Sequence, residues 1–187
     1  MVFESQRLLF RKWKISDREP FHEMNADPDV MEFFPSVLSR EESDNYLDAI
    51  ISRIERDGFG FWAVERKLSK EFIGFIGINP SNVGLDIEPC IEIGWRLKKD
   101  FWGRGYATEG AIRVLRFAFD EHKFDKVYSF TTLSNRNSEN VMKKIGMKNT
   151  NKNFYHPKLP KEHLLCEHVL YIITRDDFSY NLKEERL

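Results

Sequence analysis

The sequence has little that would direct it to a membrane or to secretion. No apolar run approaches the roughly 20 residues that a membrane span needs, and residues 1–12 mix charged with apolar side chains instead of forming a signal-peptide core. Only two cysteines occur, Cys90 and Cys166, far apart and in apolar contexts. Buried reduced thiols are therefore expected rather than a disulfide, and with them a cytoplasmic protein.

Charge of one sign is also missing. The chain has 29 basic and 30 acidic side chains, a net charge of −1. We therefore expect no nucleic-acid partner and no membrane partner. His163 and His168 have no companion ligands at metal spacing, so no metal site is expected. A monomer and a homodimer both stay open.

What is present is enough apolar sequence for a core. With 187 residues, 41% of them hydrophobic, one domain spanning residues 1–187 is expected. Periodicity and capping signals predict the element order β-α-α-β-β-β-α-β-α-β-β, hence an α/β fold with a mixed sheet and helices on both faces.

The predicted strands cover residues 7–13, 61–65, 72–78, 90–97, 127–133, 147–155 and 166–174. The strands over 61–65 and 72–78 are expected to form a hairpin. The crossover from strand 90–97 through helix 105–122 to strand 127–133 is expected to be right-handed and parallel.

The first predicted helix begins at the capping box Ser16-Asp17-Arg18-Glu19. The other predicted helices cover residues 40–57, with a second capping box at Ser39 and an end near Gly58, residues 105–122, and residues 135–145, where Asn135 can cap the helix. The three-four spacing of Leu47, Ile50, Ile51 and Ile54 predicts that the helix over 40–57 is amphipathic.

The stretch 102–109, Trp-Gly-Arg-Gly-Tyr-Ala-Thr-Glu, lies between a predicted buried strand and the clearest amphipathic helix. A short glycine loop at this place directs backbone N–H groups and the positive end of a helix dipole at one point, which suits a phosphate or pyrophosphate. A glycine turn that merely reverses the chain is the alternative. The loop is too short for a P-loop and lacks the three glycines of a dinucleotide fingerprint.

Together these runs resemble the GNAT superfamily of N-acetyltransferases, and within it the RimJ/RimL branch, which acetylates protein N-termini. The resemblance rests on five motifs: Ser5 to Arg11, Glu92-Ile93-Gly94-Trp95-Arg96-Leu97, residues 102–109, Asn135-x-x-Ser138, and Lys144-Ile145-Gly146-Met147. It implies a GNAT-type fold, with a mixed, mostly antiparallel sheet of about seven strands. It also implies acetyl-CoA as the acetyl donor, with no metal.

The resemblance further implies which residues hold acetyl-CoA. Backbone N–H groups of the glycine loop would bind the pyrophosphate. The end of the preceding strand and Asn135 would bind the pantetheine arm, and Asn140 is a weaker candidate beside them. The implied cofactor-binding residues are Trp95, Arg96, Leu97, Gly103, Arg104, Gly105, Tyr106, Ala107, Thr108, Asn135 and Asn140. Arg104 is either a phosphate partner or a solvated arginine.

Acetylation needs a group that takes a proton from the amine. Glu92 is the first candidate, because a carboxylate within an apolar strand should have a raised pKa; an edge-strand or ion-paired glutamate is the alternative. Glu88, His156 and His163 are weaker options. Ser138 is the family-matched partner of the leaving thiolate, or only a helix cap, and Asn135 is counted with the catalytic residues. Where many superfamily members carry a tyrosine acid, this chain has Met142.

The acceptor is the least determined part. We expect direct attack, in a ternary complex, by a primary amine, with an N-terminal α-amine of a protein or peptide as the first choice. A small amine, such as a polyamine, an amino acid or an aminoglycoside, is the second choice, and a non-catalytic acyl-CoA-binding module is the third. Phe33, Phe34 and Tyr155 are the candidate substrate-contacting residues, and each could instead pack against the core.

Overall fold

The computed structural model describes residues 3–81, 87 and 89–184. Its contacts divide the chain into two units, Met1–Asn79 with Gly94–Arg113, and Pro80–Ile93 with Val114–Leu187. Strand β5 (Cys90–Leu97) and helix α3 (Tyr106–Arg116) each contribute residues to both. None of the described helices is long and apolar enough to cross a membrane.

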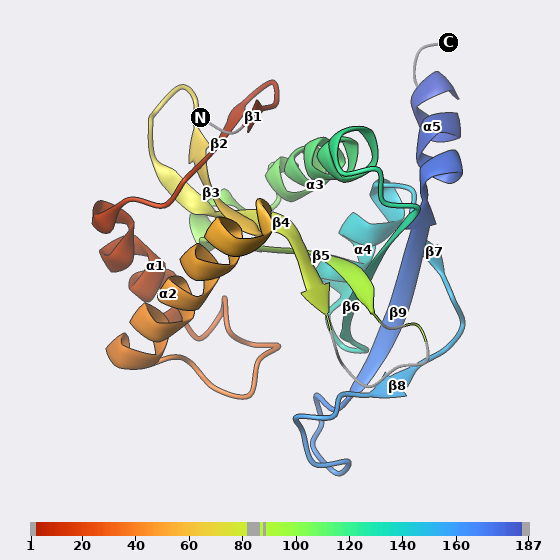
Figure 1. Ribbon diagram of the computed structural model, residues 1–187. Coiled ribbons are helices and arrows are strands. Elements are labelled where there is room, and N and C mark those ends of the chain that lie inside the picture. The colour runs from red at the N-terminus through yellow and green to blue at the C-terminus, as the bar shows by residue number, and fades with distance from the viewer. Residues whose placement is uncertain (1–2, 82–86, 88, 185–187) are drawn as a thin grey trace. The chain divides into compact units, whose positions relative to one another are not determined.

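The first unit has an antiparallel run of strands with two helices beside it (Figure 1). Its elements are β1 (Phe3–Glu4), β2 (Leu8–Arg11), α1 (Arg18–Ala26), α2 (Arg40–Asp57), β3 (Phe61–Arg66) and β4 (Phe72–Ser81), followed by the end of β5 and the start of α3. The predicted hairpin of β3 and β4 is confirmed, since Phe61 pairs with Gly77 and Val64 with Gly74.

Helix α2 has the ends that the sequence predicts. The Ser39 hydroxyl accepts the Glu42 N–H at 3.2 Å, and the Glu42 carboxylate accepts the Ser39 N–H at 2.7 Å. This reciprocal capping box starts the helix. Gly58, with φ of 77°, ends it in the left-handed conformation that glycine adopts readily.

The capping box predicted at Ser16 is wrong. Asp17, not Ser16, accepts the Lys14 N–H, at 2.7 Å, and a 3₁₀ turn over Ile15–Asp17 precedes α1. The reason is a buried ion pair: Arg11 holds the Asp17 carboxylate with two hydrogen bonds, at 2.6 and 2.8 Å. This pair fixes where the chain turns into the helix.

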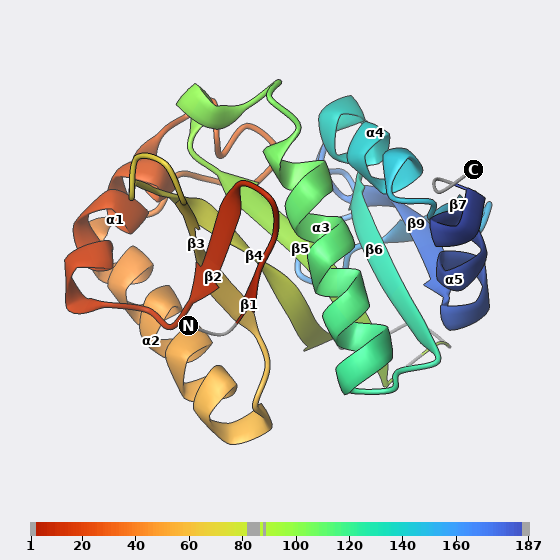
Figure 2. The ribbon, with the colours of Figure 1, turned by 90° about the horizontal axis from the view of Figure 1, so that it is seen from above.

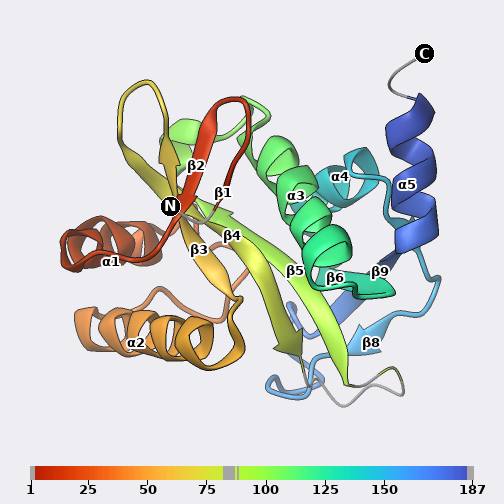
Figure 3. The same ribbon diagram turned by 45° about the horizontal axis from the view of Figure 1, so that its top comes forward.

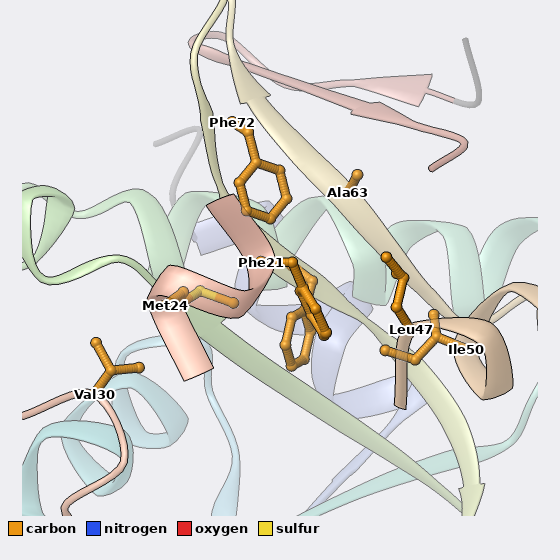
Figure 4. Packing of buried hydrophobic residues seen from close by; sticks show 8 residues of the cluster. Phe21, Met24, Val30, Leu47, Ile50, Ala63 and Phe72 are labelled. Atoms are coloured by element: carbon orange, nitrogen blue, oxygen red, sulfur yellow. The ribbon is translucent and has the colours of Figure 1, made fainter. Parts of the chain in front are cut away.

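A hydrophobic core lies between these helices and the strands of the first unit. Helices α1 and α2 lie side by side (Figure 3). In the close view, Leu47 and Ile50 of α2 point toward Phe21 of α1 (Figure 4). The buried members of this cluster are Phe21, Met24, Val30, Leu47, Ile50, Ala63, Phe72 and Phe75. The three-four spacing that predicted an amphipathic α2 therefore marks its buried face.

The second unit is built around a long antiparallel pair. Strands β6 and β9 pair from Lys126 with Thr174 to Thr132 with His168, and they lie side by side in Figure 2. Its elements are the start of β5, the end of α3 with a π-helical turn at Phe117–Glu121, β6 (Lys126–Thr132), α4 (Arg136–Lys144), β7 (Lys148–Asn149), β8 (Phe154–Tyr155), β9 (Glu167–Thr174) and α5 (Arg175–Glu184). The predicted parallel pairing of β5 and β6 is confirmed, at Glu92 with Tyr128.

Two regions of this unit differ from the prediction. The single strand expected over residues 147–155 is two short strands, because the Asn149 side chain accepts the Asn151 N–H at 2.7 Å and turns the chain. Helix α5 was not predicted. Its cap is Thr174, whose hydroxyl accepts the Asp177 N–H at 3.1 Å, so the signal Thr174-x-x-Asp177 was present in the sequence.

Backbone hydrogen bonds connect the strands in the order β1-β2-β3-β4-β5-β6-β9-β7, with β8 beside β9. Strands β5 and β6 pair in parallel, whereas β1 with β2, β2 with β3, β3 with β4, β6 with β9, β7 with β9 and β8 with β9 pair antiparallel. The predicted mixed and mostly antiparallel sheet is confirmed. The described strands number nine instead of about seven, and β1, β7 and β8 have two residues each.

Candidate active site

The glycine loop before α3 lies in the first unit and has an open backbone face. Gly103 and Gly105 have φ of 69° and 77°, which favours glycine. A Cβ atom at Gly103 would meet nothing within 4 Å, and at Gly105 it would meet only the Arg7 guanidinium, at 3.4 Å. Glu109 N–H donates to the Gly105 carbonyl at 3.0 Å. The amides before Glu109 therefore have no intrahelical acceptor and can bind an anion.

Ser5 and Arg7 hold this loop from 97 to 104 positions away in sequence. The Glu109 carboxylate accepts the Ser5 hydroxyl and the Arg7 N–H, both at 2.7 Å, and pairs with the Arg7 guanidinium at 2.5 Å. Arg7 also donates to the Arg104 carbonyl at 3.0 Å and lies over the Tyr106 ring at 4.4 Å. Burial alone would raise the pKa of Glu109, but the hydrogen bonds from Ser5 and Arg7 lower it. The sequence analysis gave Ser5 and Arg7 no such role.

The end of β5 is packed tightly against the start of β4. Gly74, with φ of 139°, has space for no side chain, because a Cβ atom there would lie 2.1 Å from the Arg96 carbonyl oxygen. The Leu97 carbonyl accepts the Trp102 indole N–H at 2.8 Å, which ties the loop to the strand. One edge of residues 96–97 is therefore occupied by β4. The expected backbone role of Trp95, Arg96 and Leu97 toward pantetheine stays a prediction.

The Arg96 side chain lies in the core of the first unit and is therefore not placed to bind a phosphate. Its guanidinium donates to the Asn25 amide oxygen at 2.6 Å and lies 4.1 Å from the centre of the Phe34 ring. Phe34 is 40% exposed, and Phe33 is half-buried. Of Phe33 and Phe34, two of the three aromatic residues expected to contact the acceptor, Phe34 is therefore the more accessible.

Glu92 lies on β5 in the second unit. Burial raises the pKa of its carboxyl to about 7, opposed by a hydrogen bond with Ser81. The predicted elevation is confirmed. No cationic side chain among residues 3–81, 87 and 89–184 forms an ion pair with Glu92, so the ion-paired alternative finds no support. A carboxyl with this pKa can exchange a proton near neutral pH.

A side-chain hydrogen bond joins β6 to β5 directly after Glu92. The buried Ser129 hydroxyl on β6 donates to the Ile93 carbonyl at 3.0 Å. The sequence analysis did not single out Ser129, because a serine inside a predicted strand carries no signal of such a bond. The bond holds the Ile93 carbonyl, and with it the backbone next to Glu92.

Helix α4 presents the second predicted motif. The Asn135 amide oxygen accepts the Ser138 N–H at 3.0 Å, so Asn135 is the helix cap, as predicted. The alternative in which Ser138 is the cap is wrong, since Ser138 supplies the N–H. Ser138 is half-buried and Asn140 is exposed. Met142 is 1% exposed and lies in the core, away from any donor role.

The remaining candidates lie in or near the late loop of the second unit. Tyr155 is 56% exposed. Burial lowers the pKa of both His156 and His168, whose rings lie 5.1 Å apart. His163 accepts the Leu165 N–H at 3.1 Å, a local loop contact. Within the described part of the chain, no group of three or more potential ligands could hold a metal ion. Glu88 lies outside the described residues.

Several known proteins are similar to this chain in sequence and in fold. An acetyltransferase (GNAT) domain profile matches residues 7–148. An uncharacterized N-acetyltransferase of Bacillus subtilis, YnaD, is 26% identical over 179 residues, which cover 96% of this chain and 100% of that one. The FsC-acetyl coenzyme A-N(2)-transacetylase of Aspergillus fumigatus is 28% identical, over 86% of this chain and 71% of that protein.

Among solved structures, a GNAT-family acetyltransferase from Bacillus anthracis superposes with a TM-score of 0.76 at 27% identity. The match covers 92% of this chain and 98% of that one. The profile match alone spans well over half of the sequence. The chain therefore belongs to the GNAT family and is an acetyl-CoA-dependent N-acetyltransferase.

Proposed function

We propose that this enzyme acetylates the α-amine of a peptide or protein N-terminus and that Glu92 is its general base. The observation that carries the proposal is the Glu92 carboxyl, whose pKa burial raises to about 7. At neutral pH such a carboxyl is ionised in a large fraction of molecules and still basic enough to accept a proton. The resemblance to the RimJ/RimL branch supports the choice of an α-amine.

The glycine loop fits acetyl-CoA as the acetyl donor, because CoA carries a pyrophosphate that the loop can bind. Acetyl-CoA supplies the acetyl group as an activated thioester. The N–H groups of Tyr106, Ala107 and Thr108 would bind the pyrophosphate, because they precede Glu109, whose N–H is the first intrahelical donor. Arg7 would keep these amides in place through Glu109. The Asn135 amide nitrogen would donate to a carbonyl of the pantetheine arm.

The proton balance follows from these residues. The attacking nitrogen forms a bond to the acetyl carbon, the carbon–sulfur bond breaks, and the nitrogen loses one proton. Glu92 accepts that proton, directly or through one water molecule. The leaving sulfur takes up a proton from solvent, and the Ser138 hydroxyl donates a hydrogen bond to it. An aliphatic hydroxyl with an ordinary pKa is a poor acid, so Ser138 stabilises the sulfur rather than protonating it.

A small amine is the second candidate acceptor. The Aspergillus fumigatus relative is named FsC-acetyl coenzyme A-N(2)-transacetylase, a name that gives an N(2) nitrogen and no protein N-terminus, which supports this second candidate. Both acceptors require the same loss of one amine proton, so Glu92 has the same role in either case.

Mass spectrometry after incubation with acetyl-CoA separates these acceptors. The panel contains peptides with free N-termini, the same peptides with blocked N-termini, and polyamines, amino acids and aminoglycosides. We expect acetylation of the free peptide N-termini and none of the blocked ones. Acetylation of small amines alone would contradict the α-amine proposal. Binding of CoA without acetylation of any amine would contradict a catalytic role.

A further inference from the structure

Arg96 is a buried cation that has no counter-ion among the residues that the structure describes. The residue is 9% exposed, and its Nε atom is buried with no hydrogen-bond acceptor. Its Nη1 atom donates a hydrogen bond to the Asn25 amide oxygen at 2.6 Å. Across residues 3–81, 87 and 89–184, no carboxylate forms an ion pair with Arg96. Burial lowers the pKa of this guanidinium.

Arg11, in the same unit, is a buried arginine with a purely structural role, and its ion pairs can be compared with the surroundings of Arg96. Arg11 is 7% exposed and is neutralised on two sides, by Asp17 at 2.6 Å and Glu65 at 2.8 Å. A buried charge without such partners is strongly unfavourable. The contrast indicates that the partner of Arg96 comes from outside the chain.

The surroundings of Arg96 hold its guanidinium ready for a ligand. Asn25 is fully buried and donates to the Ser43 hydroxyl at 3.0 Å, which fixes the amide so that its oxygen faces Arg96. Three aromatic rings surround the guanidinium, with centres at 4.1 Å for Phe34, 5.4 Å for Phe75 and 5.8 Å for Tyr46. Phe75 is 2% exposed and Phe34 is 40% exposed. Phe34 is therefore the ring that a ligand would displace.

We propose that Arg96 binds a carboxylate of the amine acceptor, so that the substrate is a primary amine that also carries a carboxylate. The unused Nε atom and the second terminal nitrogen form the planar fork that suits a carboxylate. This inference rests on the proposed acetyltransferase function and narrows its acceptor. The carboxylate belongs either to a free amino acid or to an acidic side chain near a peptide N-terminus.

Matched acceptor pairs test the proposal on the wild-type enzyme. One pair is an amino acid and its primary amide; the other is a peptide with aspartate or asparagine at its second position. We expect kcat/KM to be about tenfold or more higher for the carboxylate member of one pair, the difference lying mainly in KM. The pair that shows the difference identifies the source of the carboxylate. Equal kcat/KM within both pairs would overturn the proposal.

Variants separate binding from structure. Arg96→Gln should remove the preference, so that kcat/KM for the carboxylate acceptor equals that for its neutral partner, and Arg96→Lys should keep part of the preference. Lys98→Gln, which removes a nearby half-buried cation paired with Glu23, should leave the preference intact. An equal loss on both members of a pair in Arg96→Gln would show a structural role only. The wild-type comparison decides the question if Arg96→Gln does not fold.

A binding measurement keeps this inference distinct from the proposed function. The NMR signal of the Arg96 Nε–H group, assigned by its loss in Arg96→Lys, should shift on titration with the carboxylate acceptor and stay unchanged with the amide. If no amine is acetylated but the signal shifts, the proposed function fails and the site stands. If amines are acetylated without a carboxylate preference and the signal does not shift, the site fails alone.

Discussion

Two buried or half-buried glutamates of the second unit have pKa values moved in opposite directions. Burial raises the pKa of Glu92 to about 7. The pKa of Glu139 falls to about 2, because Tyr171 donates a hydrogen bond to its carboxylate at 2.7 Å and Lys143 and Arg136 add charged donors. The same side chain is therefore a proton acceptor near neutral pH at one position and a permanent anion at the other.

Replacing Glu92 by Gln removes the group that titrates near neutral pH. In the wild type, we expect kcat/KM to rise with pH through about 7, following the pKa of Glu92. In Glu92→Gln, that inflection should disappear and the rate should fall by roughly 100-fold. Glu162→Gln, an exposed change in the late loop, is the control. An inflection near pH 7 that survives in Glu92→Gln would remove Glu92 from this role.

The same variant should change how stability depends on pH. A folded pKa above the unfolded value of 4.5 means that the Glu92 contribution is present in full below pH 4.5 and is lost as pH rises through 7. Glu92→Gln should therefore gain stability relative to the wild type between pH 5 and pH 8, on the order of 2 kcal/mol. Urea unfolding at these pH values measures the difference. A difference that does not change with pH would contradict the raised pKa.

Gly105→Glu tests the anion-binding loop. A glutamate at φ of 77° is strained, and its charge opposes a pyrophosphate at the start of α3. We expect the dissociation constant of CoA, measured by calorimetry, to rise at least about tenfold. Gly58→Glu is a matched control, since Gly58 also has φ of 77° but ends α2. Unchanged CoA affinity in folded Gly105→Glu would refute the loop as the pyrophosphate site.

At the scale of elements, Asn135 combines a structural role with a proposed binding role. Asn135→Ala should lower the free energy of unfolding by about 1 kcal/mol through loss of the cap of α4. Asn135→Ser keeps a capping oxygen but lacks the amide nitrogen. We expect wild-type stability for Asn135→Ser, with a KM for acetyl-CoA that is raised several-fold. Wild-type KM in Asn135→Ser would confine Asn135 to capping.

The elements with strong local signals were predictable. Three of them are the capping box at Ser39, the left-handed Gly58 and the Asn135 cap. Each depends on residues within four positions of one another, so the local sequence is enough to predict it. The capping box expected at Ser16 does not form, because Arg11 on β2 binds the Asp17 carboxylate. The strand expected over residues 147–155 failed because an asparagine turn divides it.

The parts of the site that could not be predicted are long-range. The hydrogen bond from Arg7 to Glu109 joins residues 102 positions apart in sequence, and the one from Arg96 to Asn25 joins residues 71 positions apart. Neither pair has a spacing that a motif could record. The direction of the Glu92 pKa shift was predictable from its place in an apolar strand, whereas the burial that causes the shift is a property of the fold. The absence of a counter-ion for Arg96 is visible only once the fold is known.

At the scale of the whole molecule, several carboxylates favour the folded state at neutral pH. The pKa of Glu139 lies at about 2, below its unfolded value of 4.5, so its contribution is present above pH 4.5 and is lost as pH falls toward 2. Hydrogen bonds from Arg11 and Lys14 also outweigh burial and lower the pKa of Glu65. Stability should therefore decline on acidification through this window.

Glu139→Gln measures the largest of these contributions. We expect the variant to be less stable than the wild type at pH 6 by about 1–2 kcal/mol, a discounted value because Arg136 and Lys143 are exposed. The difference should shrink as pH falls from 4.5 toward 2. Urea unfolding at a series of pH values gives both numbers. A difference that stays constant down to pH 3 would contradict the lowered pKa.

The central claim is acetyl transfer from acetyl-CoA to a peptide α-amine with Glu92 as base. Its most direct test follows an isotope-labelled acetyl group by mass spectrometry, with the wild type and Glu92→Gln side by side on the same free-amine peptide. The account predicts label on the N-terminal nitrogen with the wild type, and a roughly 100-fold slower appearance with Glu92→Gln at pH 7. Equal rates for the two proteins, or no label on any amine, would contradict it.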